Sequence, residues 1–130
     1  MTAFIETLAQ LLEEPEVRIP AMRALRVFGP NAAPALEALK GQLHAVDPYV
    51  RCGALLAMES MGEIAIEGLM MGLDDPFPLN SVLAANCLNR MGPDAARAIS
   101  ALKKAMASAV LRGQKQQFQG VIDSISRAAP

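Results

Sequence analysis

The residues best suited to chemistry in this sequence are its one histidine, His44, and two side chains that follow it. Asp47 stands three positions after His44 and Cys52 lies further along, so a thiol nucleophile with a base can be imagined. Covalent catalysis needs nucleophile and base within hydrogen-bond reach, and a third group that orients the base. Nothing in the sequence orients this set. We therefore interpret His44 as a solvated loop residue and expect no enzyme activity.

The two cysteines, Cys52 and Cys87, are also poor candidates for a metal centre. They have no metal-ligand spacing and no second pair nearby, so neither a zinc site nor a disulfide framework is predicted. Both are expected to be reduced thiols packed in the core. The sequence thus predicts no metal and no cofactor.

The sequence segments that would position these residues follow a pattern that occurs three times in the chain. The segments are "EPEVRIPAMRALRVFGP" (14–30), "DPYVRCGALLAMESMGE" (47–63) and "DPFPLNSVLAANCLNRMGP" (75–93). Aligning their glycines gives spacings of 33 and 30 residues, which is typical of helical arrays and other repeat proteins. We therefore predict a repeat architecture.

The columns before each glycine follow one stripe of a helix. Apolar residues recur at i, i+4, i+7, i+8 and i+11, a spacing that a strand cannot bury on one face. The columns are Val17/Val50/Asn80, Ala21/Ala54/Ala84, Ala24/Ala57/Cys87, Leu25/Met58/Leu88 and Phe28/Met61/Met91. The remaining amides of the third copy, Asn86 and Asn89, together with Asn80, predict a polar outer face there, with hydrogen bonds between repeats as the alternative.

A second helix is predicted after each glycine. Its columns are Ala32/Ala65/Ala95, Ala35/Gly68/Ala98, Leu36/Leu69/Ile99 and Leu39/Gly72/Leu102. Gly29, Gly62 and Gly92 suit the left-handed residue that ends a helix, and Pro30 and Pro93 suit the first turn of the next. Each repeat therefore reads as a helical hairpin.

The starts of the first helices carry their own signals. Asp47-Pro48 and Asp75-Pro76 each predict a capping carboxylate followed by a preset φ angle. Pro20 lies inside the first copy and should kink its helix or delay its start to about Ile19.

The chain ends complete the array. Residues 2–13 place Phe4, Ile5, Leu8, Leu11 and Leu12 on one face, as half a repeat would, and residues 111–127 carry Phe118, Ile122 and Ile125 at helical spacing. We expect a single domain over 1–130, with repeats at about 14–46, 47–74 and 75–107. The predicted fold class is all-α, a right-handed α-α superhelix of about eight helices arranged as antiparallel hairpins.

The charge of the chain helps to decide which classes of partner it could bind. The formal net charge is −1, which argues against a strongly basic nucleic-acid-binding protein. Eleven acids face five bases up to residue 75, and two acids face seven bases from residue 76 onward. The basic second part is the only support for nucleic-acid binding.

The sequence also bears on the cellular compartment in which we expect the protein. It shows no membrane-spanning run and no signal-peptide pattern, so we expect a soluble protein and favour the cytoplasm. The oligomeric state is not predicted by any of these patterns.

The columns, with the opening "DPYVRCGALLAM" and the later "MGPDAARAISALKKA", resemble short HEAT-like repeats of the bilin-lyase type. The stretch "DDPFPLNSVLAANCLNRMGPDAARAISALKKA" is similar to arrays attached to bacterial sulfatases. The Asp-Pro-x-Val-Arg signature is intact in the second copy, has Glu14 for Asp in the first, and has Asn80 and Ser81 in place of Val-Arg in the third. No Cys-x-Pro-x-Arg sulfatase nucleophile segment is present.

The resemblance implies structural roles for the residues of the Asp-Pro-x-Val-Arg signature. In such arrays the arginines of the signature, here Arg18 and Arg51, pair with neighbouring Asp or Glu between hairpins. We assign structural roles to Gly29, Gly62, Gly92, Asp47, Arg18 and Arg51.

The resemblance also implies where a partner would bind. The second helices line the concave side of such a solenoid, so the predicted partner-binding residues are Glu37, Lys40, Glu67, Met70, Met71, Arg97 and Ser100. Exposed methionines suit adaptable binding surfaces. The competing interpretation is that Met70 or Met71 turns inward to fill the gap left by Gly72.

These observations favour a non-catalytic scaffold that binds a protein partner on its concave face. The alternative is an accessory HEAT-like segment of a larger enzyme, either a sulfatase-type hydrolase or a bilin lyase.

Overall fold

The computed structural model describes residues 1–109 and 112–129, and these residues are helical without any strand. The chain divides into two compact units, residues 1–68 and 69–130. The predicted terminal helix of 111–127 is present as α8 from Arg112, while residue 111 lies outside the described part.

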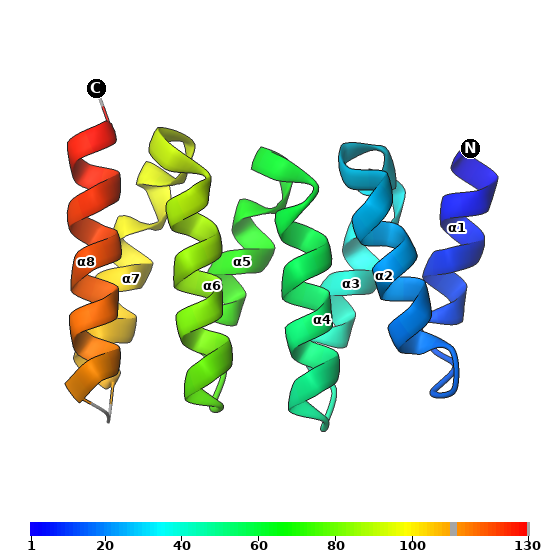
Figure 1. The fold of residues 1–130 in the computed structure, drawn as a ribbon, viewed down its shortest axis with the longest axis horizontal. Coiled ribbons are helices and arrows are strands. Elements are labelled where there is room, and N and C mark those ends of the chain that lie inside the picture. The colour runs from blue at the N-terminus through cyan, green and yellow to red at the C-terminus, as the bar shows by residue number, and fades with distance from the viewer. Residues whose placement is uncertain (110–111, 130) are drawn as a thin grey trace. The chain divides into compact units, whose positions relative to one another are not determined.

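The first unit contains α1 (Thr2–Leu11), α2 (Arg18–Phe28), the 3₁₀ helix η1 (Gly29–Ala35), α3 (Leu36–Gln42), α4 (Pro48–Glu59), the 3₁₀ helix η2 (Gly62–Ala65) and the start of α5 (Ile66–Gly72). Within it, α1 packs on η1 and α2, while α4 packs on α2 and α3 (Figure 1).

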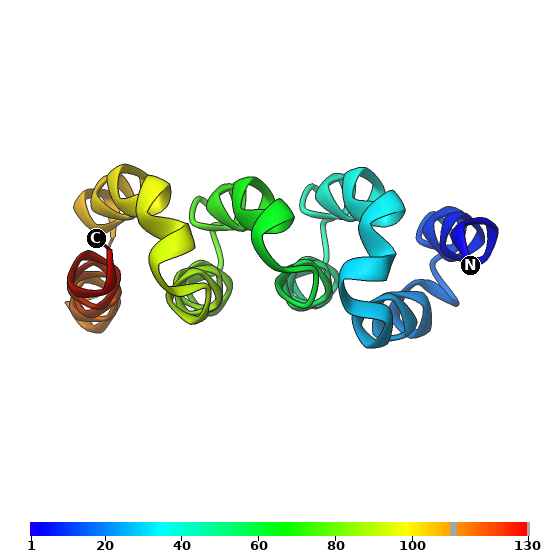
Figure 2. The ribbon, with the colours of Figure 1, turned by 90° about the horizontal axis from the view of Figure 1, so that it is seen from above.

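The second unit contains the end of α5, then α6 (Pro78–Arg90), the 3₁₀ helix η3 (Gly92–Ala98), α7 (Ile99–Ser108) and α8 (Arg112–Ala128). The last helix packs on α6, η3 and α7. Seen from above, each unit has its first helices in one layer and its second helices in another (Figure 2).

The three glycines at the predicted bends have positive φ angles. They are 59° at Gly29, 80° at Gly62 and 66° at Gly92, and no other described residue has a positive φ. The ψ angle of Gly29 is −132°, so this residue lies outside the left-handed helical region that the sequence predicted. The three positions nevertheless share a positive φ, which residues with a Cβ rarely adopt.

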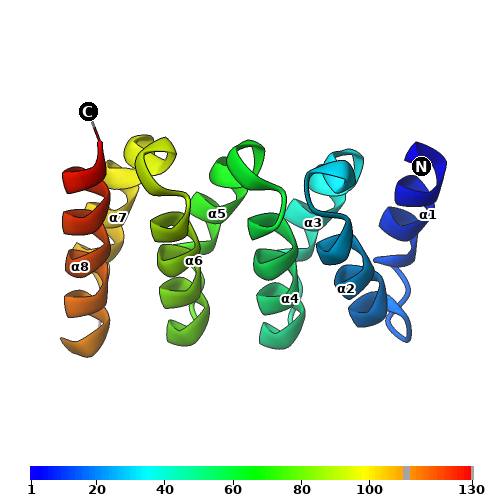
Figure 3. The same cartoon turned by 45° about the horizontal axis from the view of Figure 1, so that its top comes forward.

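The predicted second helices each begin as a 3₁₀ turn and continue as an α-helix. Figure 3 shows this path from α2 through η1 into α3, and from α6 through η3 into α7. Pro30 and Pro93 stand at the beginning of η1 and η3, where a missing N–H leaves no bond unmade. Each predicted second helix is therefore present, with a 3₁₀ turn as its beginning.

Two of the helix starts follow the sequence closely and one does not. Asp47 caps α4, because its Oδ1 accepts a hydrogen bond from the Tyr49 N–H at 2.8 Å. α2 begins at Arg18, which leaves Pro20 in the first turn. Asp75 instead accepts from the Phe77 N–H at 2.9 Å, and α6 starts only at Pro78, so the predicted cap at Asp75 was wrong.

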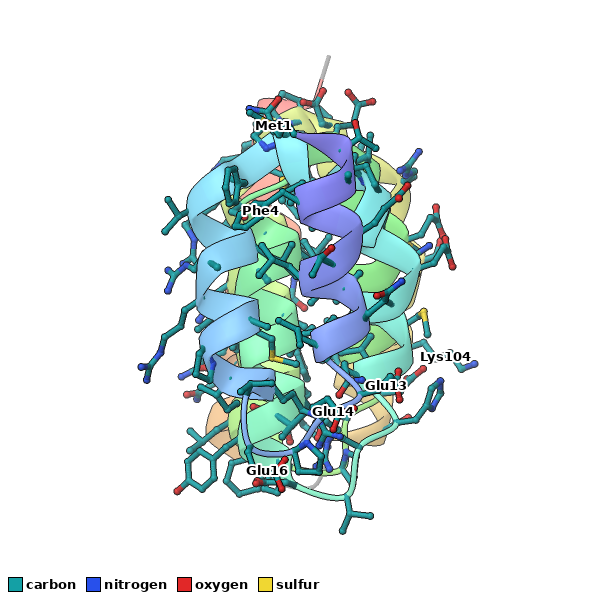
Figure 4. The ribbon with its side chains drawn as sticks, turned by 90° about the vertical axis from the view of Figure 1, so that its right-hand side faces the viewer. Met1, Phe4, Glu13, Glu14, Glu16 and Lys104 are labelled. Carbon is teal, nitrogen blue, oxygen red and sulfur yellow. The ribbon has the colours of Figure 1, made fainter. Side chains whose placement is uncertain are left out.

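The core of the first unit consists of aliphatic side chains from all its helices, with alanines where helices meet. Its fully covered members include Ile5, Leu12, Leu25, Leu39, Leu55, Met58 and Ile66. Val17 is 38% exposed, because it precedes α2 as its N-cap instead of lying inside the helix. Phe4 is 54% exposed, yet its ring stacks edge-on against Phe28 with centroids 5.6 Å apart (Figure 4).

Candidate functional site

The structure separates the candidate nucleophile from the candidate base. His44 is exposed in the loop after α3 and lines a hollow with Arg18 and Gln42, whereas Cys52 lies on α4 and lines a different hollow beside α2. The Asp47 carboxylate is engaged in capping α4. His44 and Asp47 therefore line the same hollow, but Cys52 does not join them there.

Metal and membrane sites can be assessed for the described residues. Among them, no group of three or more histidine, cysteine or acidic side chains is placed to hold a metal ion. In the same part of the chain, no helix combines the length and apolar character needed to cross a bilayer. Neither Cys52 nor Cys87 forms a disulfide, but only Cys87 is buried as predicted, since Cys52 is half-exposed.

The predicted partner-binding residues lie on the second helices of the repeats. Glu37 and Lys40 are on α3, with Glu67, Met70 and Met71 on α5, Arg97 on η3 and Ser100 on α7. All are exposed except Lys40 and Met70, which are half-buried. Glu37, Lys40 and Glu67 belong to the first unit and the other four to the second.

Within the first unit, α3 and α5 approach closely at Gly68. A Cβ built on Gly68 would stand 2.6 Å from the Met58 sulfur and 3.5 Å from Cε of Lys40. The Lys40 stem thus lies along α5, and its ammonium group meets Glu37 at 3.4 Å. An exposed pair of this kind contributes little to stability, about 0 to 1 kcal/mol.

The two methionines of α5 behave differently. Met71 is 42% exposed, whereas Met70 is half-buried. Neither side chain is fully buried. The interpretation that a methionine turns inward to fill the gap left by Gly72 can therefore apply to Met70 but not to Met71. Met71 offers a flexible, polarizable side chain to solvent.

Arg18 and Arg51 are tied to the main chain just before their own helices. Arg18 Nε donates to the Leu12 carbonyl at 2.7 Å, and Arg51 Nη1 donates to the Ala45 and Val46 carbonyls at 2.8 and 2.9 Å. Both arginines thus reach the carbonyl six residues earlier. Arg18 forms no ion pair with a described residue, so the predicted pairing with a carboxylate was wrong for it.

The third repeat has Ser81 at the position of these arginines. Ser81 donates to the Pro78 carbonyl and accepts from Gln114 Nε2 of α8 at 2.7 Å. A hollow of about 250 Å³ lies between these residues and the loop that precedes α6. Asn80 is only 2% exposed and donates to Asp75 Oδ2 at 3.4 Å, so its predicted place on a polar outer face was wrong.

The sequence interpretation missed a groove between α2 and α4, on the first helices of the repeats. It encloses about 400 Å³, with an apolar base formed by Ile19, Met22 and Leu56 and with Arg23 and Arg26 along the α2 side. A signal was present, because α2 carries three arginines and no acid.

A comparable groove lies between α6 and α8 in the second unit. It encloses about 430 Å³ and is lined by Leu79, Val82, Asn86 and Gln117 among others. In the repeat alignment Asn86 takes the position of Arg23, so the second groove has a neutral rim where the first is cationic.

No protein-family model matches the chain, and no curated protein is similar enough to it to count as a relative.

Proposed function

We propose that the chain is a non-catalytic protein-binding scaffold, built as a right-handed superhelix of about eight helices in HEAT-like antiparallel hairpins. Its partner binds the surface formed by the second helices, through Glu37, Lys40, Glu67, Met70, Met71, Arg97 and Ser100.

The observation that carries this proposal is the contrast between inner and outer columns of the second helices. Ala32, Ala65 and Ala95 are all fully buried, and Leu39 and Leu102 are likewise fully buried. Another column of these helices holds the exposed Glu37 and Ser100 and the half-buried Met70, which differ in charge, size and polarity. A repeated backbone that displays a different side chain at each step is the usual basis of recognition by solenoid proteins.

The decisive experiment compares two variants of the full chain in affinity capture from the source lysate. The surface variant combines Glu67→Lys, Met70→Ala, Met71→Ala and Arg97→Glu, and the control variant combines Gln10→Ala with Gln116→Ala, both on exposed faces of α1 and α8. Melting temperatures are measured first. The surface variant should lose a protein that the wild type and the control both retain.

The captured protein is then purified and titrated directly. A loss of affinity of about tenfold or more in the surface variant, at an unchanged melting temperature, would support the proposed surface. Equal affinity of the wild type and the surface variant would refute its placement on the second helices.

A further inference from the structure

The α2/α4 groove of the first unit has the shape of a docking site for another helix. Its two walls are helices of 11 and 12 residues, each about 16 to 18 Å long. That length accommodates about three turns of a docked helix, enough for apolar anchors at i, i+3, i+4 and i+7.

The base of the groove is apolar and closely packed. A Cβ on Gly53 would stand 2.8 Å from the Met22 sulfur, so the absence of a side chain lets Met22 pack directly on α4. Met22 is 2% exposed, and Ile19 and Leu56 are half-buried beside it. Tyr49, which is 78% exposed, adds an aromatic ring to the lining, a residue type enriched among energetically dominant interface contacts.

The charges around the groove are of one sign. Arg23 and Arg26 are exposed, stand one turn apart, and form no hydrogen bond or ion pair with any described residue. None of the residues that line the groove is acidic, and the one acid of α4 is Glu59, at its last position. Elsewhere the unit is rich in acids, including Glu13, Glu14 and Glu16 near the connection between α1 and α2 (Figure 4).

We propose that this groove docks an amphipathic helix of a partner protein, whose apolar face is flanked by Asp or Glu residues one turn apart. The apolar face covers Ile19, Met22 and Leu56. The flanking carboxylates pair with the guanidinium groups of Arg23 and Arg26, which can each present two parallel N–H donors. This site is separate from the surface of the second helices and does not depend on it.

The chain provides its own reporter and its own comparison. Cys52 lines the groove and is half-exposed, while Cys87 is fully buried, so a small alkylating reagent should modify Cys52 first. The neutral α6/α8 groove offers a similar volume without arginines. Preference for an acidic helix should therefore depend on Arg23 and Arg26 and not on Asn86.

The test is selection of a displayed peptide library by the full-length chain. Every member keeps a leucine face at i, i+3, i+4 and i+7, while the flanking positions vary among Glu, Gln and Lys. The wild type should enrich Glu at the flanks, and the double variant Arg23→Glu/Arg26→Glu should enrich Lys. Asn86→Asp in the other groove should leave the wild-type preference unchanged.

Selected peptides are then titrated and used in the alkylation assay. The acidic peptide should slow alkylation of Cys52, and its affinity should fall about tenfold or more in the double variant. Because both arginines are exposed and without partners, the melting temperature should not change. The same flank composition for both proteins, or an acidic peptide that leaves Cys52 alkylation unchanged, would overturn the proposal.

Two further measurements distinguish a partner helix from other possible occupants of the α2/α4 groove. Protection of Cys52 by dodecanoate, with no protection by any selected peptide, would assign the groove to small amphiphilic anions. Protection that rises with protein concentration alone, together with dimers in analytical ultracentrifugation, would assign it to a second copy of the chain. Either result would replace the partner helix.

Discussion

At the scale of single residues, glycines allow the backbone conformation of the bends between helices. Two arginines donate hydrogen bonds to the connections that precede their helices. Gly62 and Gly92 have positive φ angles and nothing within 4 Å of a built Cβ, so space alone would admit a larger residue there. What excludes it is the conformation itself. Arg18 and Arg51 have a different role, since each donates to a main-chain carbonyl before its own helix, Arg18 at the start of the connection and Arg51 near its end.

Replacing Gly92 by alanine should lower the free energy of unfolding by about 1 to 2 kcal/mol, because an L-residue is strained at a φ of 66°. The matched control is Gly120→Ala in the same unit, where a Cβ also meets nothing but the residue lies within α8. Removing glycine from a helix interior should raise stability by about 0.5 to 1 kcal/mol. Urea unfolding of both variants checks the pair, and two changes of the same sign would contradict the assignment.

Replacing Arg51 by methionine should lower the free energy of unfolding by about 2 to 3 kcal/mol. The residue is only 9% exposed, and its guanidinium group donates hydrogen bonds to two carbonyls. Arg23→Met serves as the control, because Arg23 is exposed and makes no such bond. Chemical denaturation should separate the two variants clearly. Similar midpoints would mean that the Arg51 bonds contribute little.

At the scale of elements, the sequence columns identified the first helices well and the second helices less well. The columns Ala32–Ala35 and Leu36–Leu39 are each three residues apart, a spacing that suits a 3₁₀ turn as well as an α-helix. The pattern could therefore not distinguish η1 from the beginning of α3. Similarly, the two prolines Pro76 and Pro78 offered two starts for α6, and only the fold selected the second.

The candidate surfaces were also predicted unequally. Exposure of Glu37, Glu67, Met71, Arg97 and Ser100 follows directly from the periodicity of the second helices. The α2/α4 groove could not be predicted in the same way, because it depends on how two helices distant in sequence approach each other. That approach is set by Gly53 against Met22, a contact that a pattern within one helix does not contain.

Gly68→Ala should destabilise the first unit by about 1 to 3 kcal/mol, because the new methyl group would overlap the buried Met58 sulfur. The double variant Gly68→Ala/Met58→Ala should lose less stability than the sum of the two single changes, since shortening Met58 makes room. Thermal melts of the four proteins complete the cycle. Strict additivity would show that the two residues do not constrain each other.

At the scale of the whole molecule, the charges and the compact units divide the chain in similar places. The excess of acids ends near residue 75, and the first compact unit ends at Gly68, within α5. Each unit combines first and second helices, so neither consists of one layer alone. The prediction of a single domain over the full chain stays a prediction.

Far-ultraviolet circular dichroism of the full chain should show a spectrum dominated by α-helix, because the described residues contain helices and no strand. Proline substitution at Ala54, in the middle of α4, should reduce the helical signal and the melting temperature together. Proline at Val46 is the control, because this residue is 97% exposed in the connection before α4 and its N–H donates to no described residue. A substantial strand contribution in the wild type would contradict the fold.

The presence of Ser81 at the position of the arginines changes which parts of the chain the hydrogen bonds of this position join. Arg18 and Arg51 each donate to main-chain carbonyls that precede their own helices, Arg18 to Leu12 and Arg51 to Ala45 and Val46. Ser81 instead accepts from Gln114 of α8, so at this position the hydrogen bond joins two helices, α6 and α8. Removing α8 would therefore take away the Gln114 donor and leave the buried Ser81 hydroxyl bonded only to the Pro78 carbonyl of its own helix.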